Sequence, residues 1–371
     1  MAALARIVEL AKEKSVDAVL IAGDIYDRAI PPAEAVQLFS NTLAQLRETG
    51  ASVVAIAGNH DSHVRVSIYD PLLSSSGVTI RGEVRRAHEP VLVSPQLGGP
   101  PVAIYPLPYL EPAVDGPGLA SSAEEGSAPI PTRLRHEDVT RLALDRIRRD
   151  LQGRPDQRSV LVAHTFVTGG ETSESERELT IGNVDRVSVE TFSGFNYVAL
   201  GHLHGSQQLE GPRVAYSGTP LPYSFSEQHH TKSVRIVELD AAGNVAVEIV
   251  PLGVGRSLCT IEGEIEQLLG DSQYATAEEA RVRVILTDEA LPLQAIARLR
   301  GRFPYVAEMR HRPPAEVRST ASERNQQVRQ ATSPFDLATS FFADQQGREA
   351  NEAETELLKE AIEAVGKGGE L

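Results

Sequence analysis

Residues that could bind metal ions or transfer protons follow the apolar runs of this sequence. They are Asp24 and Asp27 in GDIYD, Asn59, His60 and Asp61 in GNHD, His164 at the end of SVLVAH, and His202 and His204 in GHLH. Carboxylate and amide oxygens combined with imidazole nitrogens, without a thiolate, are a donor set typical of Mn, Fe or Zn. The pattern predicts a metal centre assembled from separate segments.

These donors outnumber what one ion with open positions needs. Two ions bridged by Asp24 would use them, and two ions about 3.5 to 4 Å apart are a recurring device for activating water and holding a phosphoester. His60 would then neutralise charge in the transition state and protonate the leaving oxygen. Asp61 would hold the His60 ring and favour its protonated form.

Each of these residues also has an ordinary interpretation. A Gly-Asp pair after a strand is usually a turn, and a single histidine in a polar stretch is usually solvated. The histidines that we interpret in that way, and to which we assign no role, are His63, His88, His136, His229, His230 and His311. The four segments taken together, in this order, favour a site over independent turns.

The apolar runs also define the elements that must position the site. Residues 16–22 and 52–57 are short Val- and Ile-rich runs typical of strands, and residues 31–50 between them have helical spacing. Strand, helix and strand in this order predict a parallel pair. Residues just past the ends of such strands lie at one edge of a sheet, so the polar segments should converge.

Further strands are expected later in the chain, several of them joined by short turns. They are residues 78–80, 101–105, 159–164, 196–200, 213–217, 233–239 and 244–250. A mixture of parallel and antiparallel strands favours a two-sheet α/β sandwich. Residues 111–131 are rich in Pro, Gly, Ser and Ala, and we expect a surface insertion without periodic structure there.

The chain is expected to contain three parts. Residues 1–255 would form the main domain, and residues 256–317 a small α+β domain with the order strand, helix, strand, helix, strand. Residues 318–371 would form a polar linker and C-terminal helices. Asn351 and Glu354 are in capping-box register for the last of these helices.

The composition indicates a globular protein, with 41% hydrophobic and 23% charged residues. The single cysteine, Cys259, excludes an intrachain disulfide framework, and no run approaches the roughly 20 apolar residues that span a membrane. We therefore expect a cytoplasmic protein. The net charge of -15 argues against a passive nucleic-acid binder. Local positive charge would come from metal ions, a partner, or a cluster such as Arg81, Arg85 and Arg86.

The motif segments resemble those of the calcineurin-like metallophosphoesterases, and more closely those of the SbcD-type nuclease subunits. The resemblance rests on GDIYDRAIPPAEAV, AIAGNHDS, LVAHTFVTGG, YVALGHLHGSQ and YSGTPLPYSFSE. It implies a metallophosphoesterase sandwich with a small capping domain and C-terminal helices. It also implies a manganese-dependent DNA exonuclease and endonuclease of DNA repair, recombination and replication, acting on double-strand ends, single strands and hairpins. The implied partner is an SbcC-type coiled-coil ATPase, with a nuclease homodimer inside a heterotetramer.

The resemblance assigns roles by position. Asp24 resembles the metal-bridging aspartate, His204 a ligand of one manganese, and Asn59, His164 and His202 the ligands of the other.

The resemblance also implies roles outside the metal ligands. His60 resembles the transition-state histidine, and Asp27 stands where archaeal relatives have a histidine, which implies a role in substrate binding. The C-terminal helix beyond the linker has an aromatic face expected to dock on the partner, formed by Phe335, Leu337, Phe341 and Phe342. The alternative is that this helix packs on its own domain.

One motif of the family is absent from the place where it is expected. Family members begin with a strand that ends in Asp-x-His and supplies two ligands, whereas the only Asp-x-His of this sequence is Asp61-Ser62-His63. We expect the first strand to be missing, either because Met1 is not the true start or because the chain is a shortened form. Manganese binding and nuclease activity would then be impaired. Two alternatives stay open: another binuclear phosphoesterase acting on a small substrate, and a non-catalytic binding subunit.

Overall fold

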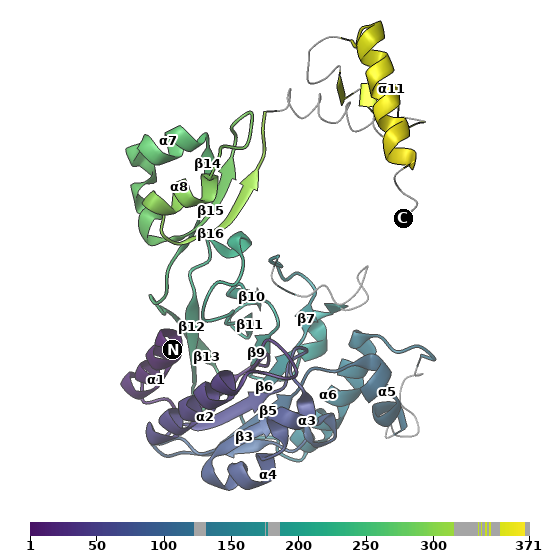
Figure 1. Ribbon diagram of the computed structural model, residues 1–371. Helices are drawn as coiled ribbons and strands as arrows, with labels where there is room; N and C mark the ends of the chain where they lie inside the picture. The colour runs from purple at the N-terminus through teal and green to yellow at the C-terminus, as the bar shows by residue number, and fades with distance from the viewer. Residues whose placement is uncertain are drawn as a thin grey trace. The chain divides into compact units, whose positions relative to one another are not determined.

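The computed structural model describes residues 1–121, 131–174, 176, 186–314, 333, 335, 338–339, 341–342 and 349–367. The chain divides into two compact units, Met1–Cys259 and Thr260–Leu371. Figure 1 shows the course of the chain through both. Among the described residues, we find no helix that combines the length and the apolar character needed to cross a membrane.

The first unit begins with a three-stranded parallel sheet. It contains β1 (Ala18–Ile21), β2 (Ser52–Ile56) and β3 (Val78–Arg81) in the order β1-β2-β3. Helix α2 (Ala33–Glu48) connects β1 to β2, and α1 (Ala2–Glu13) precedes β1. The predicted parallel pair and its connecting helix are therefore confirmed.

A second, six-stranded sheet lies against the first. Its order is β10-β11-β9-β6-β5-β4, and its strands are β4 (Val91–Val93), β5 (Val102–Leu107), β6 (Ser159–His164), β9 (Tyr197–Gly201), β10 (Gln207–Glu210) and β11 (Val214–Tyr216). The pairs among β5, β6, β9 and β11 are parallel, and β4 and β10 add antiparallel edges. This mixture is the one that the sequence predicts.

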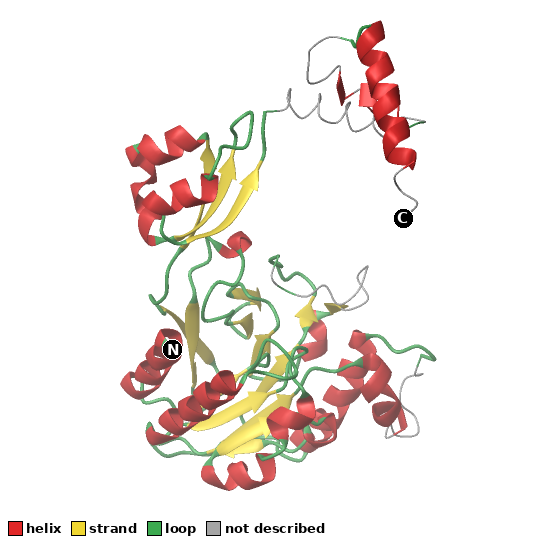
Figure 2. Cartoon of the chain, in the orientation of Figure 1, coloured by secondary structure: helices red, strands yellow, loops and turns green. Residues whose placement is uncertain are grey.

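Three apolar layers hold the sandwich together, because successive side chains of a strand point to opposite faces. Val53 and Ala55 of β2 pack toward Leu46 of α2, whereas Val54 and Ile56 pack in the cluster shared with the second sheet. A third cluster joins the far face of the second sheet to α6 (His136–Gln152). The helices on the outside of both sheets are drawn in red in Figure 2. The two-sheet α/β sandwich is thus confirmed.

The remaining elements of the first unit are short, apart from one hairpin. They are α3 (His63–Ser67), α4 (Asp70–Leu73), α5 (Pro112–Ser121), β7 (Phe166–Val167), β8 (Arg186–Val187), the antiparallel hairpin β12 (Ser233–Leu239) and β13 (Val245–Pro251), and the 3-10 turns Ser74–Ser76, Val84–Arg86, Val189–Phe192 and Phe225–Glu227.

Helix α5 contradicts the expectation that residues 111–131 lack periodic structure. Its composition resembles a loop, but Gly116 and Leu119 are buried. A Cβ at Gly116 would lie 2.6 Å from Leu134 and 3.4 Å from Val139. Packing against α6 thus stabilises a helix that local propensity does not favour.

The second unit contains a small sheet followed by a C-terminal helix. Its elements are β14 (Leu258–Gly263), α7 (Ile265–Gly270), the 3-10 segment Ser272–Glu279, β15 (Arg281–Leu286), α8 (Ala295–Arg302), β16 (Val306–His311) and α11 (Glu352–Lys367). The sheet order is β14-β15-β16, and the order of strands and helices agrees with the expected one. Asn351 and Glu354 form the expected reciprocal capping bonds, each 2.9 Å long. The boundaries 255/256 and 317/318 stay predictions.

Candidate metal centre

Four strand ends carry the predicted site residues, and the backbone is strained at two of them. Asp24 follows β1, Asn59 follows β2, His164 ends β6, and His202 follows β9. Asp24 has a φ of 46° and His202 a φ of 110°, although neither is glycine. Such conformations cost about 1–3 kcal/mol each and persist at functional sites where the surroundings enforce them.

Two glycines let these strand ends approach one another closely. A Cβ on Gly58 would lie 2.1 Å from Asp24 Oδ1, and a Cβ on Gly201 would lie 1.7 Å from the carbonyl oxygen of Ala22. No side chain fits at either distance. The close approach brings residues from both sheets into one cluster, as the sequence predicts.

Four potential metal ligands have donor atoms in mutual contact. Asn59 Oδ1 lies 2.9 Å from His164 Nε2 and 3.2 Å from His202 Nδ1. Asp24 Oδ2 lies 3.3 Å from the same His164 Nε2. Donor atoms bound at about 2.1 Å to one ion lie about 3.0 to 3.4 Å from one another in octahedral or tetrahedral geometry. The spacing therefore fits a single ion.

The hydrogen bonds of the cluster also favour a cation. His164 Nδ1 donates to the carbonyl oxygen of Ala22 at 2.7 Å, which turns Nε2 toward the two oxygens of Asp24 and Asn59. Asn59 Nδ2 is buried without a hydrogen-bond partner. Within the described part of the chain, no group of three His, Cys, Asp or Glu side chains is arranged to hold a metal ion by itself. The set therefore depends on the amide oxygen of Asn59.

The protonation states suit this interpretation. Burial by itself raises the pKa of Asp24, but the charge of His164 and hydrogen bonds from His164 and the His60 N–H outweigh it, so the pKa lies well below its usual range. Burial and the nearby charge of His164 lower the pKa of His202 to about 3. At neutral pH, Asp24 is thus an anion and His202 a neutral imidazole, the forms that bind metals.

Known proteins share the segments that carry this cluster. Residues 1–206 match the family described as calcineurin-like phosphoesterase. The SbcD subunit of the nuclease SbcCD from Bacillus subtilis (strain 168) is 32% identical over 307 residues, which cover 80% of this chain and 75% of that protein. The chain belongs to the SbcD-type calcineurin-like phosphoesterases.

A second SbcD-type relative is the same subunit of the nuclease SbcCD from Staphylococcus epidermidis (strain ATCC 12228 / FDA PCI 1200). It is 30% identical over 256 residues, which cover 68% of this chain and 63% of that protein. The match thus spans less than two thirds of this relative's length. A solved structure of a family 1 b-glucosidase from Thermotoga maritima in complex with isofagomine lactam covers 84% of this chain and 76% of its own at 11% identity. Its TM-score of 0.18 does not indicate a shared fold.

Calcineurin-like phosphoesterases use divalent metal ions, and without one His202 should make stability depend on pH. Its pKa is about 3 in the folded chain and about 6.5 in the unfolded one. Between these values the unfolded state binds more protons, so the free energy of unfolding should fall as the pH falls, by at most about 1.4 kcal/mol per unit. His164 adds no slope there, because its folded pKa is raised by the charge of Asp24 despite burial.

Urea titrations of metal-free protein at pH 7, 6 and 5 test this expectation. The His202→Asn variant should lose most of the slope, whereas a His88→Asn variant, changed at a histidine outside the site, should keep it. An equal slope in wild type and His202→Asn would contradict it.

His60 and Asp61 lie where the SbcD-type motif places them, but they do not contact each other as expected. His60 Nδ1 donates to the carbonyl oxygen of Asp27 at 3.0 Å and lies 3.9 Å from its carboxylate. Asp61 instead accepts backbone hydrogen bonds of 2.9 Å from Ile25, Tyr26 and Gly58. The expectation that Asp61 holds the His60 ring is therefore wrong. Asp61 ties the GDIYD and GNHD turns together.

His204 lies in the same loop as His202, and its charge contributes to the lowered pKa of His202. Its Nδ1 lies 3.1 Å from Glu227 Oε1, and Lys232 forms an ion pair with the same carboxylate. Sequence reasoning assigned no role to Glu227 or Lys232. The only signal was that Glu227 ends the YSGTPLPYSFSE segment of SbcD-type proteins.

Two further expectations from the sequence need correction. His136 is not a solvated histidine, because it is buried at the start of α6 and its ring centroid lies 5.7 Å from that of Tyr109. Arg81 is 5% exposed and pairs with Asp70 at 3.2 Å, so it does not offer positive charge to a nucleic acid. Both residues stabilise the fold.

Proposed function

We propose that this chain is the DNA nuclease subunit of an SbcCD-like complex, which hydrolyses phosphodiester bonds at DNA ends and hairpins with divalent metal ions. Mn²⁺ is the ion that we propose, because it suits the mixed N/O donor set. The observation that carries the proposal is the contact of Asp24, Asn59, His164 and His202 donor atoms in a chain related to the SbcD subunit of the nuclease SbcCD. The relatives' name supports the substrate and the process: DNA in repair, recombination and replication.

The residues of the cluster would share the work of hydrolysis. Asn59, His164 and His202 would hold one ion, His204 would bind the second, and Asp24 would bridge them. Bound divalent ions lower the pKa of coordinated water and neutralise phosphate charge. His60 is tied to Asp27 through Nδ1, so its Nε2 is the atom that can stabilise the phosphate or protonate the leaving oxygen. Asp27 has a side chain that is 82% exposed beside His60 and would contact substrate.

The two metal sites would differ in completeness. The first would rely on Asp24 and His204, because the only Asp-x-His of the 371 residues belongs to the GNHD turn. We infer that this chain binds the ion of that site weakly and has reduced nuclease activity. A polypeptide extended at its N-terminus by a strand ending in Asp-x-His should then cleave DNA faster than this chain, and equal rates would contradict the inference.

Cleavage assays separate the proposal from its alternatives. Hairpin DNA and a small diester, bis(p-nitrophenyl) phosphate, are each incubated with the chain and Mn²⁺, with and without excess EDTA. Cleavage of the hairpin that EDTA abolishes supports the nuclease. Hydrolysis of the small diester alone favours a phosphoesterase of small substrates. Failure on both substrates, also with the extended polypeptide, favours a non-catalytic binding subunit.

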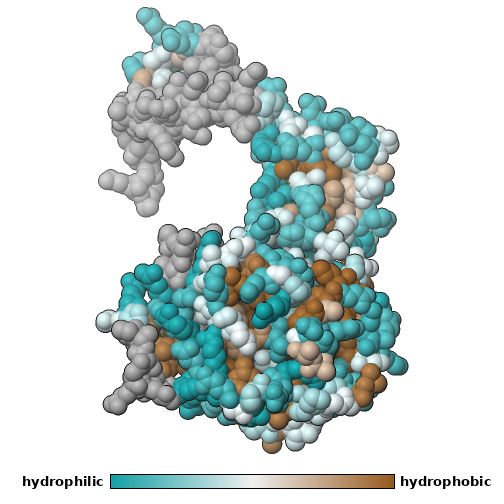
Figure 3. Space-filling model, turned by 180° about the vertical axis from the view of Figure 1, so that it is seen from behind, coloured by the Kyte–Doolittle hydropathy of each residue, from teal (hydrophilic) through white to brown (hydrophobic). Residues whose placement is uncertain are grey.

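The proposed partners are an SbcC-type coiled-coil ATPase and a second copy of this chain. Beside the GNHD turn, α3 and α4 expose Val64, Ile68 and Leu72 by 56%, 60% and 72%, a surface that a second copy could cover. Apolar areas also occur on the opposite face, seen in Figure 3. Exposed apolar area therefore does not mark one face, and the homodimer rests mainly on the resemblance.

The C-terminal helices are the proposed docking element for the ATPase. Phe335, Phe341 and Phe342 are described as helical, and Phe341 is 66% exposed, whereas Leu337 lies outside the described residues. Lys359 Nζ of α11 lies 5.7 Å from the Phe335 ring centroid.

Removal of residues 333–371 should abolish co-purification with an SbcC-type ATPase. Sedimentation of the same samples gives the stoichiometry, and the shortened chain should still dimerise if α3 and α4 form the homodimer contact. Equal ATPase binding by both chains would reject the docking role.

A further inference from the structure

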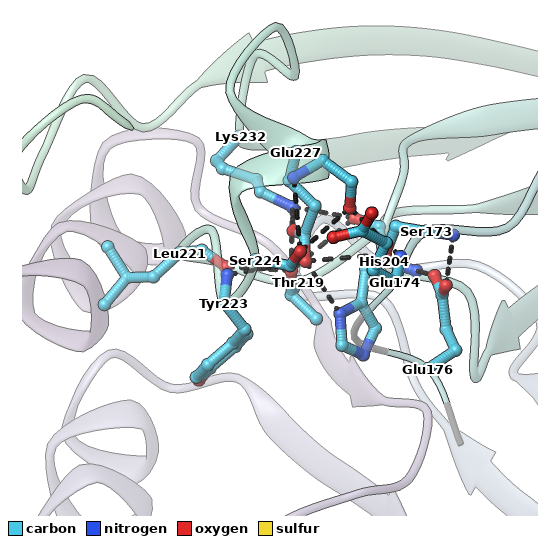
Figure 4. Close-up of polar contacts among 11 residues, drawn as sticks. Ser173, Glu174, Glu176, His204, Thr219, Leu221, Tyr223, Ser224, Glu227 and Lys232 are labelled. Carbon is cyan, nitrogen blue, oxygen red and sulfur yellow. Dashed lines mark hydrogen bonds and ion pairs between the residues drawn. The ribbon is translucent and has the colours of Figure 1, made fainter. Parts of the chain in front are cut away.

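Glu227 is a buried carboxylate that the proposed reaction does not yet use. Its side chain is 0% exposed, and burial of a charged group is costly unless that group is paired and hydrogen-bonded. Figure 4 shows it among side chains from the loop of His204 and from the 219–232 segment. Its position calls for a reason beyond surface solubility.

The two carboxylate oxygens of Glu227 have different partners. Oε1 lies 3.1 Å from His204 Nδ1 and also accepts from Ser173 Oγ at 3.5 Å and from the Tyr223 N–H at 3.4 Å. Oε2 forms the ion pair with Lys232 Nζ. The cation keeps Glu227 ionised, and an ionised carboxylate only accepts hydrogen bonds. The proton of a neutral His204 ring is thereby held on Nδ1, which leaves the lone pair on Nε2.

Lys232 fixes the backbone of the same histidine. Its Nζ donates to the carbonyl oxygen of His204 at 2.9 Å and to Thr219 Oγ1 at 2.9 Å. The Thr219 N–H donates to the same carbonyl at 3.1 Å. The strained φ of 110° at His202 lies two residues away. Ring, carbonyl and loop are thus held by one buried unit (Figure 4).

We propose that Glu227 and Lys232 are positioning residues that hold His204 in the tautomer and orientation in which Nε2 can bind a divalent metal ion. The inference rests on the proposed function, in which His204 is a ligand. Carboxylates that orient metal-binding histidines in this way typically contribute 10- to 100-fold to metal affinity. Neither residue would touch the substrate.

The test compares the full-length chain with its Glu227→Gln variant in two measurements without DNA. Histidine ¹⁵N NMR of metal-free protein should give His204 the Nδ1–H tautomer in wild type and a mixture in the variant. Titration with Mn²⁺, followed by its EPR signal, should show about 10- to 100-fold weaker binding of one ion in the variant. Glu248→Gln, which changes an exposed carboxylate paired with Lys14 at 2.6 Å, is the matched control and should change neither.

A double-mutant comparison separates positioning from general destabilisation. In a His204→Asn background, Glu227→Gln should weaken Mn²⁺ binding by less than about twofold, because the histidine that it positions is gone. If Glu227→Gln does not fold, the Glu227→Gln/Lys232→Met variant removes both buried charges and replaces it in each measurement. Unchanged tautomer and affinity would overturn the proposal. Absence of Mn²⁺ binding by wild type would instead overturn the proposed function.

Discussion

The Asp24→Asn variant is expected to bind Mn²⁺ more weakly than wild type by over about 100-fold, the upper value for loss of an outer-sphere partner, and to lose metal-dependent hydrolysis. Asp24 supplies the only negative charge among the four donors in contact, and the charge of His164 helps to hold its pKa low. Asparagine preserves the shape, tolerates the φ of 46°, and can still accept the His60 N–H bond of 3.0 Å. The change therefore removes charge more than structure.

Isothermal titration with Mn²⁺ and the hairpin assay measure the two effects. The Asp145→Asn variant serves as the control, because Asp145 is a half-exposed carboxylate on α6 that pairs with Arg148 at 3.2 Å. Thermal unfolding of both metal-free variants checks that the fold persists. Wild-type Mn²⁺ affinity in Asp24→Asn would show that the four donors do not form the metal centre.

The convergence of the site could be predicted because it depends on a strong local pattern. Apolar runs that end in Gly-Asp, Gly-Asn or His fix both the strand and the first polar residue after it. Parallel strands then bring those residues to one edge, whatever their separation in sequence. Asp24, Asn59, His164 and His202 are in contact for this reason.

The partners of the site residues could not be predicted in the same way, because they depend on how the turns bend. Asp61 binds three backbone N–H groups of neighbouring turns rather than the adjacent His60, and no sequence pattern specifies that choice. Glu227 reaches His204 across 23 residues from a segment without regular periodicity. Tertiary packing likewise decides α5, whose Pro and Gly content favours a loop.

The Gly201→Ala variant is expected to lower the free energy of unfolding by about 3 kcal/mol or more, at the upper end of what overpacking usually costs. The added Cβ would lie 1.7 Å from the carbonyl oxygen of Ala22 and 2.9 Å from His164 Nδ1. That carbonyl accepts the His164 Nδ1 hydrogen bond of 2.7 Å. Because its obstacle is backbone, the methyl group can fit only if the ends of β1 and β9 separate, which also displaces a metal ligand.

Gly205→Ala is a matched control from the same loop. Its Cβ would come no closer than 3.3 Å, to the ring of His230, which is a side chain that can move. We expect a change within about 1 kcal/mol for this variant. Urea unfolding and Mn²⁺ titration of both variants measure stability and metal binding separately. If Gly201→Ala were as stable as Gly205→Ala, the strand ends could not approach as closely as described, and the contact between Asn59 and His164 that defines the centre would lose its structural basis.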